Sequence, residues 1–349
     1  MVIGTSKPRP FGTPLARSSI GSKSLPKVLG LYFFVVGSIV SGASGSITIY
    51  GDPSDIFTNS NPDIDTGVNI WYHVRMTRIT LIIPDIHHKW ERAEKIISKV
   101  GADEVIFLGD YFDDFGDDPH MVKDTVDWLE ASVAKPERIH LFGNHDQHYA
   151  FVYKTFQCSG YAQWKYFIVR DNINPKVWDK LKWFHFLDNR WLLSHAGLHR
   201  LNVPPEVVKY RKDRKKFIAA ITEFLDKEIR KGFQAGAEGV GSWVFNAGHA
   251  RWGQQRVGGI TWCDYTAEFY PVKGINQIVG HTPQQYGVKW CRLTADDQLF
   301  HHSFEEYTPT TEILDNPDLS TNVCLDVLGN MHYGIWDGKQ LKLGDYKSL

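Results

Sequence analysis

Short apolar runs alternate with amphipathic segments in the central part of the chain. Residues 79–83, 105–108 and 139–142 are mostly apolar, as expected for strands buried on both faces of a sheet. Between these runs, apolar residues recur at helical spacing from Trp90 to Val100 and from Val122 to Val133. The alternation of strands and helices predicts an α/β domain with a parallel sheet.

Five polar clusters each follow an apolar run. In open α/β sheets, ligands bind beyond the carboxyl ends of the strands, so we expect the clusters to converge. Their carboxylates, imidazoles and amide oxygen suit Mn²⁺, Fe or Zn²⁺ better than Ca²⁺, and their number predicts two ions. The clusters are Asp85-Ile86-His87, Gly109-Asp110-Tyr111-Phe112-Asp113, Gly143-Asn144-His145-Asp146, Ser194-His195-Ala196-Gly197 and Gly280-His281-Thr282-Pro283.

These motifs, DxH, GDxxD, GNHD, SHAG and GHT in that order, resemble those of the calcineurin-like metallophosphoesterases over about residues 78–345. Pro283 stands where nucleases of that superfamily carry a second histidine. The chain is therefore most similar to the branch with serine/threonine phosphoprotein phosphatases, lambda-type phosphatases and diadenosine tetraphosphatases. The resemblance implies a four-layer β-sandwich flanked by helices.

The resemblance also implies a dinuclear centre that holds two divalent metal ions, Mn, Fe or Zn. One ion would have two ligands of its own, the other would have three, and Asp110 would bridge them. Two such ions activate a water and clamp the phosphoryl oxygens. The implied ligands are Asp85 and His87 for the first ion, Asn144, His195 and His281 for the second, and Asp110 for both.

Two further residues match catalytic positions of the family. His145 corresponds to the general acid that protonates the leaving oxygen, and Asp113 corresponds to the carboxylate that orients this histidine. General acids are commonly histidines tuned by a positioned neighbour.

One position departs from the phosphoprotein phosphatases. Their second motif continues with an arginine that grips the substrate phosphate, whereas this chain has Asp114. The acidic stretch 110–118 would repel a polyanion, which weakens the case for a dinucleotide polyphosphate. Arg251 and Arg256 are the candidates to bind the phosphate instead.

The favoured function is metal-dependent hydrolysis of phosphomonoesters, with protein-phosphatase-like activity as one form. The enzymatic alternative is hydrolysis of dinucleotide polyphosphates or phosphodiesters. A non-catalytic binding module that keeps the fold is a more distant alternative, because all six matched ligands and His145 are present.

Amino-acid composition limits the binding partners and the cellular compartment that we expect for the protein. The 349 residues include 39 Lys and Arg and 40 Asp and Glu, so there is no clear signal for nucleic acid or a membrane surface. We expect a phosphorylated substrate, and the oligomeric state is open. Four scattered cysteines favour reduced thiols in the cytoplasm.

The predicted domains are an N-terminal extension over residues 1–75 and a catalytic domain over residues 76–349. The apolar run 28–40 fits either a signal peptide, which would leave export open, or a buried strand of a β appendage. A helical insert is expected at about 199–258, with a basic start at 209–216, and substrate selection is expected to reside there. A packing helix with a solvated basic face is a simpler interpretation of these basic residues than a role in binding phosphate.

Overall fold

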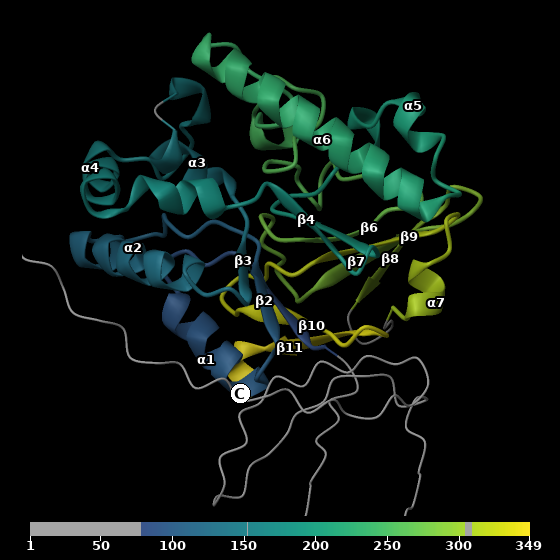
Figure 1. The fold of residues 1–349 in the computed structure, drawn as a ribbon, viewed down its shortest axis with the longest axis horizontal. Coiled ribbons are helices and arrows are strands. Elements are labelled where there is room, and N and C mark those ends of the chain that lie inside the picture. The colour runs from purple at the N-terminus through teal and green to yellow at the C-terminus, as the bar shows by residue number, and fades with distance from the viewer. Residues whose placement is uncertain (1–77, 152, 304–308) are drawn as a thin grey trace, which may run out of the picture. The chain divides into compact units, whose positions relative to one another are not determined.

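Two β-sheets form the centre of the described protein (Figure 1). The computed structural model describes residues 78–151, 153–303 and 309–349, so the predictions for residues 1–75 lie outside the described residues. The first sheet has the strand order β11 (Leu341–Asp345), β10 (His332–Trp336), β1 (Thr80–Ile83), β2 (Glu104–Phe107) and β3 (Arg138–His140). The second has the order β4 (Phe184–Leu187), β5 (Trp191–Ser194), β6 (Asn276–Val279), β9 (Ser320–Cys324), β7 (Lys289–Leu293) and β8 (Leu299–Ser303).

Helices cover the outer faces of both sheets. In Figure 1, α1 and α2 lie against the first sheet, and α6 lies across the second. The helices of the described residues are α1 (Trp90–Val100), α2 (Pro119–Val133), α3 (Asn144–Ala150), α4 (Gln163–Asn172), α5 (Pro205–Val208), α6 (Arg214–Ala237) and α7 (Thr311–Leu314). This four-layer α/β architecture confirms the predicted fold.

Alternating side chains of β1 separate two hydrophobic layers. Leu81 and Ile83 pack in a buried cluster with Ala93 of α1 and Val126 of α2. Ile82, between them in sequence, lies in a second cluster that fills the space between the two sheets. Because successive side chains of a strand point to opposite faces, one apolar run supplies both layers.

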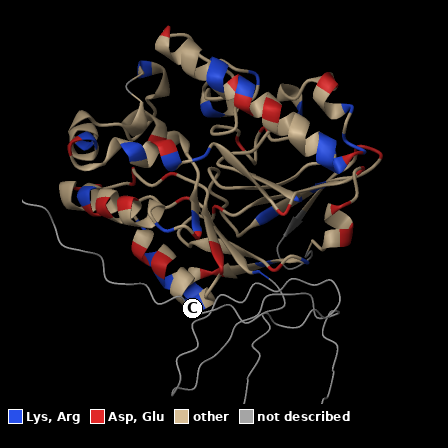
Figure 2. Ribbon diagram, in the orientation of Figure 1, with Lys and Arg blue, Asp and Glu red and all other residues tan. Residues whose placement is uncertain are grey.

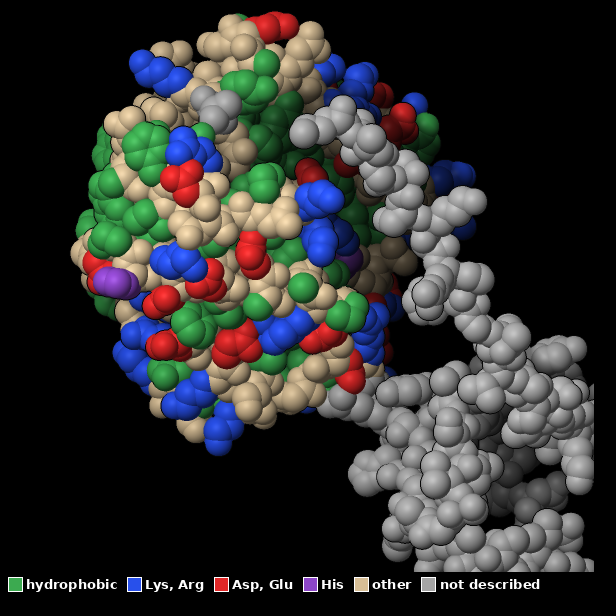
Figure 3. All heavy atoms as spheres, turned by 60° about the vertical axis from the view of Figure 1, so that its left-hand side comes forward, with side chains coloured by type: hydrophobic (Ala, Val, Ile, Leu, Met, Phe, Trp, Pro, Cys, Tyr) green, Lys and Arg blue, Asp and Glu red, His purple; other side chains and the backbone are tan. Residues whose placement is uncertain are grey.

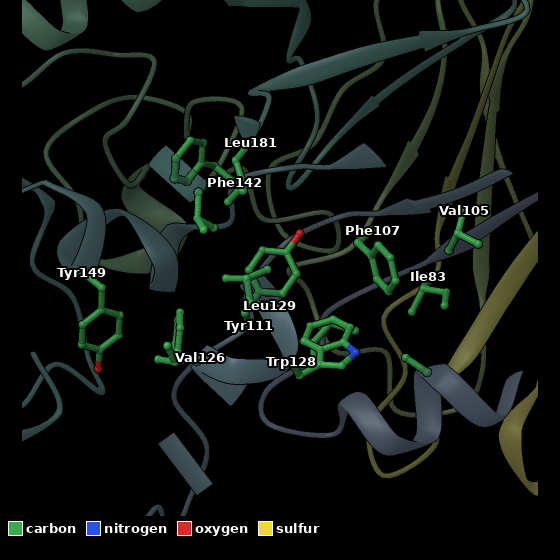
Figure 4. Packing of buried hydrophobic residues seen from close by; sticks show 14 of the residues in the cluster. Ile83, Val105, Phe107, Tyr111, Val126, Trp128, Leu129, Phe142, Tyr149 and Leu181 are labelled. Atoms are coloured by element: carbon green, nitrogen blue, oxygen red, sulfur yellow. The ribbon is translucent and has the colours of Figure 1, made fainter. Parts of the chain in front are cut away.

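Aromatic residues fill the space between the first sheet and α2 (Figure 4). Phe107 of β2 meets Trp128 of α2 edge to face, with ring centroids 5.6 Å apart. His140 of β3 stacks on Phe107 with centroids 4.4 Å apart. Aromatic pairs of this kind add stabilisation beyond the area they bury. They anchor the two strands that lead into the second and third polar clusters.

The strand directions bring the polar clusters to one edge. β1, β2 and β3 run parallel, with Leu81 opposite Val105 and Ile106 opposite Ile139. In the second sheet, β5, β6 and β9 run parallel to one another. The parallel pairing confirms the prediction from the apolar runs. Strand boundaries differ from the predicted ones by one or two residues.

The predicted helical insert contains α6, which packs against the second sheet. Phe217, Ile221 and Leu225 bury one face of α6 in a cluster that also holds Leu192 of β5. Basic side chains gather at its first turn, as Figure 2 shows. Lys215 and Lys216 are exposed, as expected for a packing helix with a solvated basic face.

Charges are interspersed over much of the surface. Figure 3 shows one face on which acidic and basic side chains alternate with apolar ones. Many of these charges form local ion pairs, such as Lys123 with Asp127 on α2. Within the described ranges, no helix has the length and apolar character needed to cross a membrane.

Candidate metal centre

All six predicted metal ligands lie just beyond the carboxyl ends of parallel strands. The first sheet supplies four of them and the second sheet supplies two, so the site lies where the two sheets meet. The ligands are Asp85 and His87 after β1, Asp110 after β2, Asn144 after β3, His195 after β5 and His281 after β6.

Asp85, His87 and Asp110 form one group of possible ligands. One ligand atom from each lies within 4.8 Å of the others. His87 Nε2 is 3.9 Å from Asp85 Oδ2 and 3.7 Å from Asp110 Oδ2. On the other side of the ring, Nδ1 lies 2.5 Å from the Asp113 carbonyl oxygen and 3.0 Å from that of Phe112, so it can donate to them. This donation leaves the lone pair of Nε2 facing the two carboxylates.

Asp110, His195 and His281 form the second group. His195 Nε2 is 3.3 Å from Asp110 Oδ2, 3.2 Å from His281 Nδ1 and 2.9 Å from Asn144 Oδ1. His195 Nδ1 lies 3.0 Å from the Leu108 carbonyl oxygen, which fixes the ring in the same manner as His87. Asp110 belongs to both groups, which is the arrangement expected of a bridging ligand.

The donor set fits divalent cations. Two ligands about 2.1 Å from one ion, at roughly tetrahedral or square angles, lie about 3.0–3.4 Å apart. The spacings around His195 match this range. His281 Nε2 is buried and has no hydrogen-bond partner among the described residues, so its Nδ1 is the nitrogen aimed at the other ligands.

The electrostatics of the centre favour positive charge. Burial lowers the pKa of His195, but the Asp110 and Asp85 carboxylates outweigh this and raise it to about 9. Burial raises the pKa of Asp110, yet the imidazoles of His195 and His145 hold it well below its usual range. The same field that attracts a proton to His195 would attract a metal ion.

Backbone strain is concentrated at the ligands. His87, Asp110 and His281 have φ angles of 41°, 51° and 68°, a region that residues other than glycine rarely adopt. The neighbouring glycines permit close approach. A Cβ atom on Gly143 would lie 2.0 Å from Asp110 Oδ1, and one on Gly280 would lie 2.1 Å from Asp85 Oδ1. The glycines of the GN and GH motifs are thus required by the packing of the metal ligands.

His145 and Asp113 form the contact expected of an oriented general acid. His145 Nδ1 is 3.0 Å from Asp113 Oδ2, and the His145 backbone N–H donates to Asp110 Oδ1 at 2.9 Å. Burial lowers the pKa of His145, but the charge of Asp110 and the hydrogen bond to Asp113 raise it well above its usual value. The raised pKa favours the protonated imidazole, and the ring faces the cavity at the metal centre.

Three residues around Asp113 were missed by the sequence reasoning. His148 is buried, and its Nε2 lies 3.0 Å from Asp113 Oδ2. The Tyr149 hydroxyl donates to Asp113 Oδ1 at 2.6 Å, and Lys165 Nζ donates to the same oxygen at 2.7 Å. The spacing of His145 and His148 on one helical face was a usable signal. Lys165, far along the chain, carried none.

Asp146 has a structural role that its motif did not reveal. Its carboxylate accepts hydrogen bonds from the backbone N–H groups of Gly143, Asp110 and Tyr111, at 2.8–2.9 Å. It therefore fastens the loop after β2 to the loop after β3. This link holds the bridging ligand beside Asn144.

A cavity of about 470 Å³ opens above the ligands. Arg251 lies in its lining, with Nε bonded to Asp264 Oδ2 at 2.7 Å. Arg256 is exposed and is not among the described residues that line the cavity. The chain reverses after Arg251, through a left-handed Trp252, so the two arginines are not presented together. Arg251 is also the only residue of the predicted insert among the described residues of that lining.

Asp114, which replaces the expected arginine, is paired with a lysine. Lys89 Nζ lies 2.6 Å from Asp114 Oδ2, and both residues line the cavity. The positive charge of Lys89 is thus partly neutralised at the position where phosphoprotein phosphatases would present an arginine.

The fold and the metal centre together define a metal-dependent phosphoesterase. The model of the calcineurin-like phosphoesterase family matches residues 80–285, more than half of the chain. The chain belongs to this family, whose members hydrolyse phosphoric esters at a centre of two divalent metal ions. No curated protein sequence matches the chain.

Several solved structures are similar in part. A proposed diadenosine tetraphosphatase shares 13% identity with a TM-score of 0.38, covering 78% of this chain and 95% of that one. A metallophosphoesterase from Sphaerobacter thermophilus shares 14% identity with a TM-score of 0.40, covering 77% and 88%. A protein serine/threonine phosphatase from Saccharomyces cerevisiae shares 11% identity with a TM-score of 0.38, covering 76% and 79%. Likenesses this distant say nothing about the substrate.

Proposed function

We propose that the protein is a phosphomonoesterase in which His145 protonates the leaving oxygen of a phosphoryl group held at the dinuclear centre. Two divalent ions, when bound, supply a hydroxide from a bound water and withdraw charge from the phosphoryl oxygens. Asp85, His87, Asp110, Asn144, His195 and His281 would hold them.

The charge balance of the cavity carries the proposal. Its lining contains five aspartates and three basic residues, Lys89, Arg92 and Arg251. With His145 protonated, as its role of general acid requires, the four positive charges of two divalent ions would leave the lining with a net charge of about +3. This charge complements a phosphate monoester dianion. A diester monoanion would be matched less well.

The basic residues have little capacity for further phosphates. Lys89 is paired with Asp114, and Arg251 is paired with Asp264. Only Arg92 lines the cavity without a carboxylate partner among the described residues; its guanidinium lies 5.5 Å from the centre of the Tyr346 ring. A dinucleotide polyphosphate would bring several charges that these side chains do not neutralise.

The catalytic residues act on the leaving group and on the phosphoryl oxygens. Because His145 Nδ1 is bonded to Asp113, Nε2 is the nitrogen that delivers the proton. Arg251 Nη2 lies 3.4 Å from the Thr282 hydroxyl oxygen, which is a long and weak hydrogen bond. This nitrogen can therefore turn toward a phosphoryl oxygen of the substrate.

The test compares three substrates with purified full-length protein loaded with Mn²⁺, Fe²⁺ or Zn²⁺ in turn. We expect p-nitrophenyl phosphate to be hydrolysed in preference to bis(p-nitrophenyl) phosphate and diadenosine tetraphosphate. The variant His145→Ala should retain its metal ions and lose most of its activity toward phenyl phosphate, whose leaving oxygen needs a proton. Faster turnover of the diester or of the dinucleotide would contradict the proposal and support the alternative hydrolases.

A further inference from the structure

A buried lysine contacts the carboxylate that supports the general acid. Lys165 lies on α4, with only 5% of its surface exposed. Its Nζ is 2.7 Å from Asp113 Oδ1 and 2.5 Å from Asp117 Oδ2. Lysines are almost never this buried unless they are paired. Lys165 is not among the cavity-lining residues, so it acts on the site only through other residues.

The carboxylate of Asp113 is contacted by four polar side chains. Oδ1 receives Lys165 and the Tyr149 hydroxyl, while Oδ2 faces His145 Nδ1 and His148 Nε2, each at 3.0 Å. Three hydrogen bonds, from Lys165, Tyr149 and His145, and the contact with His148 restrain the orientation of this carboxylate. The direction of the His145 ring depends on that orientation.

Lys165 also ties together the two ends of a short acidic loop. Asp113 begins this loop with a left-handed φ of 64°, and Asp117 accepts a hydrogen bond from the Asp114 backbone N–H at 2.7 Å. A strained conformation of this kind persists only when its surroundings hold it in place. The ammonium group of Lys165 supplies that restraint, because it attracts both carboxylates to α4.

We propose that Lys165 is a positioning residue for proton transfer: it holds Asp113 and the acidic loop so that His145 is aimed at the leaving oxygen. Without the ammonium group, two buried carboxylates that share one partner would repel each other. Asp113 would turn away, and His145 would lose its support. The proposal rests on the proposed phosphomonoesterase activity and adds a residue outside the cavity to its machinery.

The dependence of the rate on the leaving group distinguishes positioning from a general loss of structure. A phenol with a pKa of about 10, similar to that of a tyrosine side chain, needs protonation as it departs. The more acidic p-nitrophenol needs it much less. A defect in proton delivery therefore slows phenyl phosphate more than p-nitrophenyl phosphate, whereas partial unfolding or metal loss slows both equally.

The experiment measures kcat and KM for both substrates with the metal-loaded full-length protein. For Lys165→Met we expect kcat with phenyl phosphate to fall about tenfold further than kcat with p-nitrophenyl phosphate, with KM and metal content unchanged. His145→Ala should show the same preference in stronger form. Arg170→Met removes an exposed ion pair with Asp171 on the same helix, and it should behave as wild type.

Two more variants keep the test decisive if Lys165→Met folds poorly. Lys165→Arg preserves the positive charge and should restore the wild-type leaving-group preference. The double variant Lys165→Met/Asp117→Asn removes the repulsion, so it should recover thermal stability. Because Asp113 still lacks the ammonium group of Lys165 there, the selective loss with phenyl phosphate should remain.

The inference and the proposed function fail in different ways. If the wild type hydrolyses neither monoester, the proposed function is wrong. If the wild type is active but Lys165→Met, or the stable double variant, slows both substrates equally or not at all, the positioning role of Lys165 is wrong. A folded Lys165→Arg variant as impaired as Lys165→Met would also overturn it.

Discussion

The metal ligands and the surroundings of the general acid are built differently, although they share one cavity. The metal floor consists of Asp85, His87, Asp110, Asn144, His195 and His281. The proton wall consists of Asp113, His145, His148, Tyr149 and Lys165. Each metal ligand of the floor follows the carboxyl end of a strand. Hydrogen bonds with backbone groups hold several of these side chains in place. The wall is held by contacts between side chains from α3, α4 and the acidic loop.

Because of this difference, we expect substitutions in the two regions to impair different properties: metal binding in the floor and proton delivery in the wall. The floor depends on strand order and on close backbone packing, as at Gly143 and Gly280. A change of a ligand side chain should therefore remove metal binding and leave the fold in place. The wall depends on one carboxylate, Asp113, with four partners. A change there should leave the metal ions bound and impair proton delivery.

The largest expected effect is in the metal floor, at Asp110. Asp110→Asn keeps the size of the side chain but removes the negative charge shared by both ligand groups. We expect metal-dependent turnover of p-nitrophenyl phosphate to fall by on the order of 10³-fold or more, together with loss of bound metal. Activity and elemental analysis of the purified variant check this.

Asp127→Asn is a suitable control for Asp110→Asn. It removes a carboxylate from an exposed ion pair with Lys123, and it should leave both turnover and metal content unchanged. Near-normal turnover in Asp110→Asn, at an unchanged melting temperature, would show that this residue is not the bridging ligand.

A smaller effect is expected in the proton wall. His145→Ala should reduce turnover of phenyl phosphate, whose leaving oxygen needs a proton, by about 10²-fold or somewhat more, the usual contribution of a general acid. Because His145 contacts neither ligand group through its ring nitrogens, both metal ions should stay bound. Elemental analysis of this variant tests the separation of the two regions directly: loss of metal in His145→Ala would mean that they are one unit.

The metal floor could be predicted from the sequence because its residues follow recognisable strands. Apolar runs located β1, β2 and β6, and short motifs located the ligands at their ends. Strands β7 and β8 were not predicted, because their polar and charged residues interrupt any apolar run. The closing hairpin turns at Asp337 and Gly338, where Gly338 adopts a φ of 84° between β10 and β11.

The proton wall could be predicted only in part. Asp113 and His145 belong to motifs, but their partners lie on elements whose relative position no local pattern records. Lys165 is 52 residues from Asp113 in the sequence. The same limit applies to Arg251 and Arg256, which were equal candidates by spacing. Only the reversal of the chain at Trp252 separates them.

A third expected effect is a pH-dependent change in the free energy of unfolding, caused by His140 of β3, the strand that leads to Asn144. Burial, followed by the charge of Arg138, lowers the pKa of His140 to about 3. Its ordinary pKa is 6.5, so below pH 6.5 the unfolded chain gains a proton that the folded protein excludes. At pH 5 the free energy of unfolding is therefore lower than at pH values well above 6.5 by roughly 2 kcal/mol, about 30-fold in the equilibrium constant.

Denaturant unfolding at several pH values tests this contribution. His140→Gln should show a shallower loss of stability below pH 6.5 than the wild type, whatever its stability at neutral pH. His120→Gln, at an exposed position of α2, should keep the wild-type slope. Equal slopes for His140→Gln and the wild type would mean that His140 is not a neutral, buried base.

The smallest expected effect distinguishes the two arginines at the rim of the cavity. Arg251 lines the cavity, whereas Arg256 is exposed outside its described lining. A hydrogen bond to a charged group contributes about 1.5 kcal/mol, so Arg251→Ala should raise KM for p-nitrophenyl phosphate about tenfold. Arg256→Ala should leave KM unchanged. If Arg251→Ala and Arg256→Ala give the same KM, the metal floor alone holds the phosphoryl group. Neither arginine then replaces the arginine that is missing from the second motif.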